Sequence, residues 1–319
     1  MTTRTVLQAS PPELLAKAAA LHHLELEVTR RVEGALSGEF IAYGRGPGSE
    51  RVGARRYEPG DDARRIDWNL TARTMHPYVH VTEPDRELET WFVADLSASL
   101  DFGTAEREKR ELVLAGMAAF GFTASRAGNR FGVLTLGGQQ IGRTRPRSGR
   151  RAVLAALAAA YDSPRHTAAP EPGADLAAAL RDLHRVHRRR GRVVVLSDFL
   201  DAADWSTPLR ALSSRHDVVA VHVVDPRELE LPDVGMLRVV DPETGRLLEV
   251  QTRSATLRQR YAEAAAARHQ QIRVRIEAAD AAYLPLRTDE DWALALVRFF
   301  RAQSRADRSR RRTNAKADA

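Results

Sequence analysis

Residues 89–103, ETWFVADLSASLDFG, contain the strongest structural signal in the chain. Within them, residues 90–94 form a short, largely apolar run with Trp91, Phe92 and Val93, whose length and residue types predict a buried β-strand. The run ends at Asp95, and Ser97 and Ser99 follow among small residues that allow the backbone to turn tightly. One carboxylate and two hydroxyls are therefore expected to converge at the end of the strand. A hard divalent ion such as Mg2+ prefers oxygen ligands of this kind, whereas zinc favours thiolate and imidazole.

The pattern Asp95-x-Ser97-x-Ser99 after a buried strand resembles the metal-ion-dependent adhesion site of a von Willebrand factor A domain. The same residues have a simpler interpretation, because serine-rich turns often cap helices. Both interpretations remain open on this motif alone, and other parts of the chain bear on the choice.

The composition limits the classes of protein to consider. With 319 residues, the chain is long enough for a parallel-sheet domain of about 200 residues and a smaller accessory region. It has 49 Lys and Arg against 42 Asp and Glu, and its lysines are Lys17, Lys109 and Lys316. Much of the arginine excess lies at residues 188–190 and 298–312, which is more typical of solvated surface than of a specific nucleic-acid site.

The location of the protein is also constrained by composition. The chain has no cysteine, which excludes disulfides and thiolate metal sites. No run approaches the roughly 18 apolar residues that a membrane span needs, and the N-terminal sequence lacks the apolar segment of a signal peptide. We therefore expect a soluble, cytoplasmic protein.

Strand and helix patterns alternate along the chain, which predicts a doubly wound α/β fold with a mainly parallel sheet. Strands are predicted at residues 130–136, 192–196, 217–224 and 272–276, helices at 106–125, 151–161, 173–188, 204–214, 255–271 and 289–301, and a β-hairpin at 236–250. We divide the chain into an N-terminal helix and β-rich accessory segment (1–87), a von Willebrand factor A-like domain (88–302) and a basic tail (303–319). The tail is expected to be disordered because it lacks an apolar period.

A dense run of opposite charges lies in the accessory segment. It begins at Arg56, continues through the turn residues Pro59 and Gly60, and ends at Arg73. The charged residues that we assign to partner binding are Arg56, Asp61, Asp62, Arg64, Asp67 and Arg73. The alternative is a structural network of ion pairs that fastens this segment to the main domain, with Trp68 buried.

The same run carries a resemblance to a family. The residues Arg56-Tyr57-x-Pro59-Gly60-Asp61-Asp62-x-Arg64-x-Ile66-Asp67-Trp68-x-x-Thr71-Ala72-Arg73, followed by Asp95-x-Ser97-x-Ser99, resemble the bacterial family catalogued as domain of unknown function 58. Members of that family resemble von Willebrand A domains and are commonly encoded beside MoxR-type AAA+ ATPases. The resemblance therefore implies a von Willebrand factor A-like fold and a MoxR-type partner, and it leaves the activity undefined.

Two aspartates are expected at one edge of the sheet. Asp95 and Asp198 each follow a predicted central strand, and ligands of open α/β sheets bind outside the carboxyl ends of the strands. The resemblance to the adhesion site implies that Asp95, Ser97 and Ser99 ligate Mg2+ or Mn2+ and that Asp198 holds a coordinated water. The usual threonine of the third loop is replaced by Ala174, and Thr167 is the nearest threonine.

Our leading hypothesis is a non-enzymatic adaptor that binds an unknown client or a MoxR-type AAA+ ATPase through the metal edge and the charged run. The alternative is a metal-dependent hydrolase that uses Asp95 and Asp198. Less favoured are a hydrolytic metal site at Asp61 and Asp62, a metal site at His184 and His187, which more simply form a basic surface, and an arginine-based nucleic-acid module.

Overall fold

The computed structural model describes residues 11–36, 51–58, 66–82, 88–105, 107–125, 128–137, 141–165, 175–240 and 246–317. Its centre is a six-stranded sheet with the order β10-β7-β6-β3-β4-β5. The strands are β3 (Glu89–Asp95), β4 (Arg130–Leu136), β5 (Gly142–Ser148), β6 (Arg192–Ser197), β7 (Asp217–Val224) and β10 (Ala282–Arg287). Only β5 runs antiparallel to its neighbour, and the other pairs are parallel. The predicted doubly wound, mainly parallel α/β sheet is therefore confirmed.

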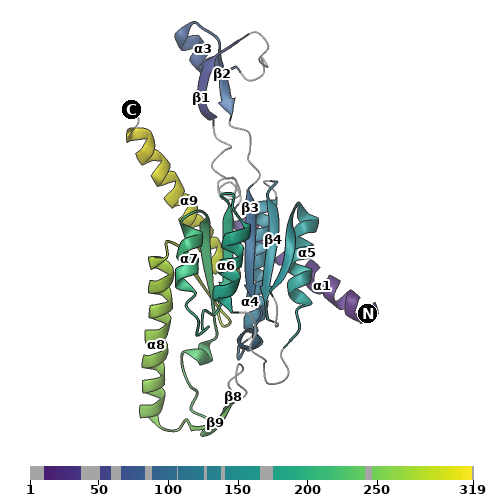
Figure 1. The fold of residues 1–319 in the computed structure, drawn as a ribbon, viewed down its shortest axis with the longest axis vertical. Helices are drawn as coiled ribbons and strands as arrows, with labels where there is room; N and C mark the ends of the chain where they lie inside the picture. Colours follow the sequence, from purple (N-terminus) through teal and green to yellow (C-terminus); the bar gives the residue numbers. More distant parts are fainter. Residues whose placement is uncertain are drawn as a thin grey trace.

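Helices cover both faces of the sheet (Figure 1). The first face packs against α4 (Lys109–Ser125), α5 (Arg150–Tyr161) and α9 (Trp292–Ala317), and α1 (Pro11–Glu27) and η1 (Val28–Glu33) extend this core by packing on those helices. The second face packs against α6 (Leu176–Val186), α7 (Ser206–Ser213) and α8 (Ala255–Ala278). None of the helices in the described ranges combines the length and the apolar character that a bilayer span requires.

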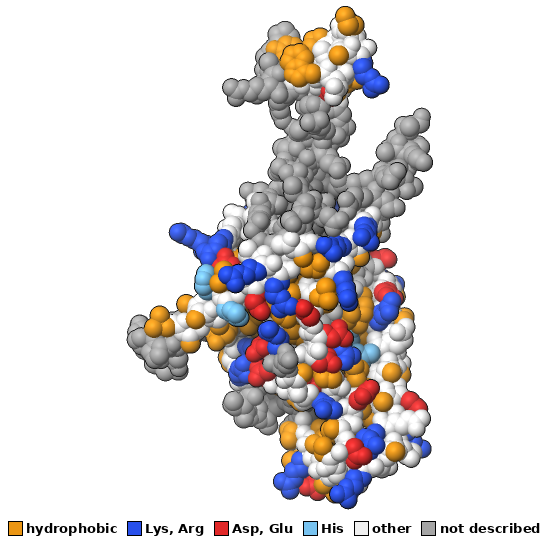
Figure 2. Space-filling view, turned by 180° about the vertical axis from the view of Figure 1, so that it is seen from behind, with side chains coloured by type: hydrophobic (Ala, Val, Ile, Leu, Met, Phe, Trp, Pro, Cys, Tyr) orange, Lys and Arg blue, Asp and Glu red, His pale blue; other side chains and the backbone are white. Residues whose placement is uncertain are grey.

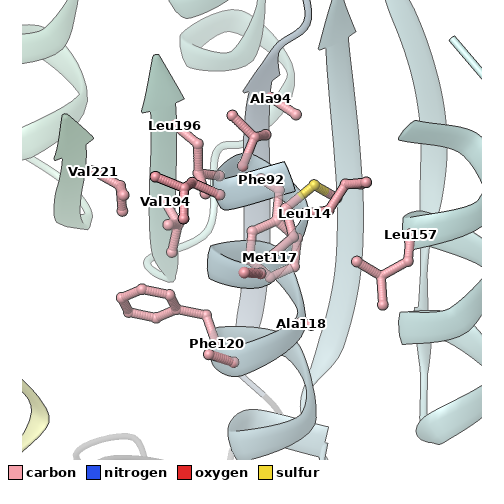
Figure 3. Packing of buried hydrophobic residues seen from close by; sticks show 14 of the residues in the cluster. Phe92, Ala94, Leu114, Met117, Ala118, Phe120, Leu157, Val194, Leu196 and Val221 are labelled. Atoms are coloured by element: carbon pink, nitrogen blue, oxygen red, sulfur yellow. The ribbon is translucent and has the colours of Figure 1, made fainter. Parts of the chain in front are cut away.

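Strand β3 is apolar because both of its faces are buried. Phe92 and Ala94 belong to the core on the first face, while Trp91 and Val93 belong to the core on the second. This alternation follows from the two-residue period of a strand. Figure 3 shows the first core, in which Phe92 and Val194 lie near Met117 of α4. The residues that predict the strand therefore contribute side chains to both cores.

The last predicted strand is wrong. Residues 272–276 belong to the continuous helix α8, and the sheet is completed instead by β10. Ile272 and Ile276 are buried in the second core, four residues apart on one face of the helix. Strand β10 contains Pro285, which is tolerated because β10 lies at an edge of the sheet.

The expectation of a disordered tail is also wrong for most of its length, because α9 continues to Ala317. The tail is rich in arginine and alanine, and both residues have a high helix propensity. A segment without an apolar period can therefore extend a helix that is already anchored through Trp292 and Phe300 in the core.

Two small sheets lie outside the main one. In the accessory segment, β1 (Arg51–Arg56) pairs antiparallel with β2 (Tyr78–Thr82) and is accompanied by α3 (Trp68–Thr74). The predicted hairpin is confirmed as β8 (Met236–Val240) and β9 (Leu247–Gln251), which pair antiparallel. In Figure 1 the accessory sheet lies beyond the end at which β3 begins, and the hairpin lies beyond the opposite end.

Candidate site at the carboxyl edge of the sheet

The predicted aspartates lie on the two central strands. Asp95 ends β3, and Asp198 directly follows β6, which is hydrogen-bonded to β3. From β3 the chain proceeds outward through β4 and β5, whereas β6 starts the other half of the sheet with β7 and β10. The two strands thus flank the point where the order reverses, which is the usual ligand position in open α/β sheets.

The side chain of Asp95 is buried and accepts hydrogen bonds from both central loops. Its Oδ1 accepts from the Ser97 backbone N–H (3.1 Å) and the Ser97 hydroxyl (2.6 Å), and its Oδ2 accepts from the Ser197 hydroxyl (2.6 Å). The Oγ atoms of Ser97 and Ser99 are 3.2 Å apart. Burial and the negative charge of Asp198 raise the pKa of Asp95 to about 6, although the hydrogen bonds from serine act in the opposite direction.

Asp198 is buried beside a lysine. Its Oδ2 accepts a hydrogen bond from Nζ of Lys109 (2.8 Å), and its Oδ1 accepts one from the Leu200 backbone N–H (3.1 Å). Burial acts to raise the pKa of Asp198, but Lys109 and a hydrogen bond from Ser99 bring it below its usual value. The motif residues Asp95, Ser97 and Ser99 and the aspartate of β6 are therefore brought together in one cluster.

Lys109 connects this cluster to a further carboxylate, that of Glu228. Its side chain is fully buried at the start of α4, and its Nζ also lies 2.5 Å from Oε1 of Glu228. Burial acts to lower the pKa of Lys109, but Asp198 and Glu228 raise it, so the ammonium stays charged. Glu228 is in turn fixed in a capping box, because its Oε2 accepts from the backbone N–H of Asp225 at the start of η5 (Pro226–Glu228).

Gly137 is required beside the Asp95 turn. It has a φ of 129°, and a Cβ there would lie 2.3 Å from the backbone oxygen of Leu96. The Leu96 N–H donates to Leu136 O at 2.9 Å, so this contact holds the start of the loop after β3. A side chain at position 137 therefore displaces the backbone between Asp95 and Ser97.

We predict that Gly137→Ala lowers the free energy of unfolding by about 2–4 kcal/mol, because it adds a backbone clash to an unfavourable φ. Gly128→Ala is the matched control: its φ is 76°, but nothing lies within 4 Å of the added Cβ. Urea denaturation monitored by circular dichroism measures both. Equal losses in the two variants would contradict the close contact at Leu96.

The rim of this edge exposes apolar side chains. Phe102, in the loop after the serine motif, is 39% exposed, and Leu200, in the loop after Asp198, is 40% exposed. The β8–β9 hairpin presents more of them, namely Met236, Val239, Val240, Leu247 and Leu248. In Figure 2 apolar side chains are visible at the end of the molecule where Figure 1 places this hairpin.

The residues fit the predicted metal only in part. Asp95, Ser97 and Ser99 provide the oxygen donors that a hard cation prefers. Asp198, which is predicted to hold a coordinated water, accepts from Lys109 through its Oδ2, so a water would have to share this carboxylate with the ammonium. Within the described ranges, no three His, Asp or Glu side chains are placed to hold a metal ion. Ala174 and Thr167 lie outside the described residues. Mg2+ or Mn2+ stays a prediction, and the function proposed below does not depend on it.

Those predicted partner-binding residues that the structure describes are not part of this cluster. Asp61, Asp62 and Arg64 lie outside the described residues, and Arg56 and Arg73 are exposed on β1 and α3. Asp67 caps α3 by accepting from the backbone N–H groups of Asn69 and Leu70. The alternative interpretation of this segment, with Trp68 buried, is wrong on that point, because this side chain is 69% exposed. The accessory segment lies beyond the start of β3, and the aspartate cluster lies at its end (Figure 1). Strand β3 is about 20 Å long, so the two are well separated.

The expected basic surface at the end of α6 is also wrong in part. His187 is buried, its ring is stacked on that of His216 with centroids 4.3 Å apart, and its Nδ1 lies 3.2 Å from Glu89. Burial and the neighbouring His187 lower the pKa of His216 to about 4. These histidines therefore form part of the interior near the start of β3 rather than a solvated face.

Sequence reasoning missed three members of the site, Lys109, Ser197 and Glu228. Ser197 precedes Asp198 directly and was hidden by the apolar run of β6. Lys109 gave one usable signal: it is one of three lysines in a chain that otherwise uses arginine for positive charge. Its ammonium is a compact point charge on a flexible stem, which reaches both Asp198 and Glu228.

Known proteins resemble this chain in sequence and in structure. The chain matches the family model described as "Protein of unknown function DUF58" over residues 53–272. Uncharacterised proteins of Mycobacterium tuberculosis and Mycobacterium bovis are each 46% identical to it over 288 residues, which is 90% of this chain and 90% of each relative. Among solved structures, it is similar to the conserved hypothetical protein BatB from Bacteroides thetaiotaomicron (TM-score 0.40, 10% identity, 69% of this chain and 99% of that chain). It is also similar to the SpRpn10 VWA domain (TM-score 0.36, 12% identity, 66% of this chain and 94% of that chain).

Proposed function

Because this chain belongs to the DUF58 family of proteins of unknown function, we propose its role from its own geometry. It is a non-enzymatic interaction module that binds a MoxR-type AAA+ ATPase through the carboxyl edge of its sheet and presents a client protein to it. The MoxR-type partner is suggested by the resemblance in the sequence, and the binding edge is suggested by the structure.

The observation that carries the proposal is the combination of a polar floor with an apolar rim at this edge. Ser97 and Ser99 are partly accessible above the buried aspartates, while Phe102 and Leu200 expose apolar surface on the loops beside them. Protein interfaces typically combine central apolar anchors with hydrogen-bonding groups. On the face shown in Figure 2, acidic, basic and apolar side chains are interspersed.

The β8–β9 hairpin supports the same edge as the binding surface. An isolated two-stranded sheet is marginally stable in water, yet these strands pair only with each other among the described strands. Val240 and Leu247 face each other across the hairpin and are 56% and 54% exposed. A partner that covers them removes apolar surface from water and stabilises the hairpin.

The test is co-purification of the tagged full chain with a co-expressed MoxR-type ATPase. We predict that Val240→Glu combined with Leu247→Glu lowers the affinity at least about tenfold, because charges then enter a desolvated contact. Val274→Glu is the matched control, since Val274 is 50% exposed on α8, outside the hairpin. Undiminished binding by the hairpin variant would contradict this edge as the docking surface.

A separate assay addresses the enzymatic alternative. The purified chain is incubated with phosphodiester and peptide substrates in the presence of Mg2+ or Mn2+, and Asp95→Ala serves as the control. We expect no turnover by either protein. Hydrolysis by the wild type that disappears in Asp95→Ala would overturn the proposal in favour of a metal-dependent hydrolase.

A further inference from the structure

The carboxylates at the carboxyl edge share a cation that belongs to the chain itself. Asp95, Asp198 and Glu228 gather three carboxyl groups at this edge, and the ammonium of Lys109 contacts the last two. Burying an ammonium is costly unless charged partners surround it. Here its two carboxylate partners come from the loops that follow β6 and β7, while the lysine itself begins α4.

The carboxylate oxygens of the two aspartates predicted at the metal site, Asp95 and Asp198, are already hydrogen-bonded within the chain. Both oxygens of Asp95 accept from serine donors, and the two oxygens of Asp198 accept from Leu200 and Lys109. An ion that used Asp198 in the predicted way would have to share that carboxylate with the ammonium. A divalent ion whose water is held by Asp198 would lie close to the Lys109 ammonium, and two cations on one buried carboxylate repel each other.

The position of Lys109 reproduces the mechanical role of a bound ion. A cation at an adhesion-type site draws together loops that follow adjacent strands. The ammonium does so here, because it joins the loops after β6 and β7 to the start of α4 through contacts of 2.8 and 2.5 Å. These contacts are fixed further by the capping box of Glu228.

We propose that Lys109 is the resident cation of this site: its ammonium replaces the divalent ion that the serine motif implies, and the site keeps its shape without metal. The inference concerns the isolated chain and does not rest on the proposed partner. It changes the expected docking chemistry, because a partner then contacts the serine hydroxyls and the apolar rim instead of completing the coordination of an ion.

The first experiment needs no variant. The full-length chain, first treated with EDTA and then dialysed, is titrated with MnCl2, and free Mn2+ is followed by electron paramagnetic resonance. We expect no bound Mn2+ at micromolar concentrations and the same melting temperature in Mn2+ and in EDTA. Binding of one Mn2+ per chain that is lost in Asp95→Asn would overturn the inference. Loss of co-purification with the ATPase would not, so the two proposals fail separately.

The second experiment asks whether a metal can take the place of the ammonium. Lys109→Met leaves Asp198 and Glu228 without their cation, so the variant should melt below the wild type in EDTA, bind about one Mn2+ per chain and melt several degrees higher when Mn2+ is added. Lys17→Met is the matched control, because Lys17 pairs with Asp162 in a different part of the molecule.

A third variant keeps the test decisive. In Lys109→Met combined with Asp198→Asn, both members of the buried ion pair are replaced by uncharged residues. Mn2+ should then no longer raise the melting temperature. The double variant should also melt at a higher temperature than Lys109→Met in EDTA. If Lys109→Met folds but neither binds Mn2+ nor gains stability from it, the lysine does not stand in for an ion and the inference is wrong. If Lys109→Met does not fold, the wild-type titration still decides.

Discussion

Replacing Asp198 by alanine is expected to lower the free energy of unfolding by about 3 kcal/mol or more. The substitution leaves the buried ammonium of Lys109 with Glu228 as its remaining carboxylate partner. Removing one member of a buried ion pair typically costs about 3–5 kcal/mol, because the other charge stays desolvated. The lower end applies here, since Glu228 keeps part of the compensation. Guanidinium denaturation of the purified chain measures the loss.

Asp217→Ala is the matched control for this prediction. Asp217 also pairs with a basic residue, Arg192, at 2.7 Å, but its side chain is 58% exposed. Exposed pairs contribute about 0–1 kcal/mol, so the control should lose far less stability than Asp198→Ala. Similar losses in both variants would show that the Lys109 ammonium is rehydrated when its partner is removed, which contradicts the buried position described for it.

Replacing Trp205 by alanine is expected to cost about 3–5 kcal/mol. The indole is fully buried, its Nε1 donates to the backbone oxygen of Phe199 at 3.2 Å, and its ring meets that of Phe199 edge-on at 5.0 Å. Phe199 follows Asp198 directly and has a φ of 55°, which is unfavourable for a bulky residue. Trp205 therefore holds a strained backbone in the loop that carries the aspartate.

Two variants separate the roles of this indole. Trp205→Phe keeps most of the packing but loses the hydrogen bond to Phe199, so its loss should be intermediate. Trp68→Ala removes the same side chain from an exposed position on α3 and should change stability by no more than about 0.5 kcal/mol. If Trp205→Ala and Trp68→Ala unfold at the same denaturant concentration, the buried position of Trp205 is contradicted.

The parts of the fold that sequence predicts correctly rest on local signals. Strand β3 is flanked by helices on both faces, so its residues 90–94 are largely apolar, and a charged residue marks its end at Asp95. The same signal marks Asp198 after β6. Because parallel strands deliver their carboxyl ends to one edge, two local patterns are enough to predict that these aspartates meet.

The parts that sequence misses depend on contacts between distant residues. Lys109 is 89 residues from Asp198 and 119 from Glu228, so its burial has no local signature. The strand prediction at residues 272–276 is wrong for a different reason. Their alternation of apolar and charged residues satisfies a strand, while the spacing of Ile272 and Ile276 also satisfies a helix. Only packing against the second core selects the helix.

The two outermost strands of the main sheet limit how other chains can attach to it. Pro146 lies in β5 and Pro285 in β10, and a proline offers no N–H to a further strand. Strand β5 also carries Arg143, Arg145 and Arg147, whose charges discourage edge-to-edge aggregation. The main sheet therefore resists lateral growth into fibres or strand-swapped assemblies. Among the described strands, the two small sheets β1–β2 and β8–β9 are the better places for a polypeptide to attach as an added strand.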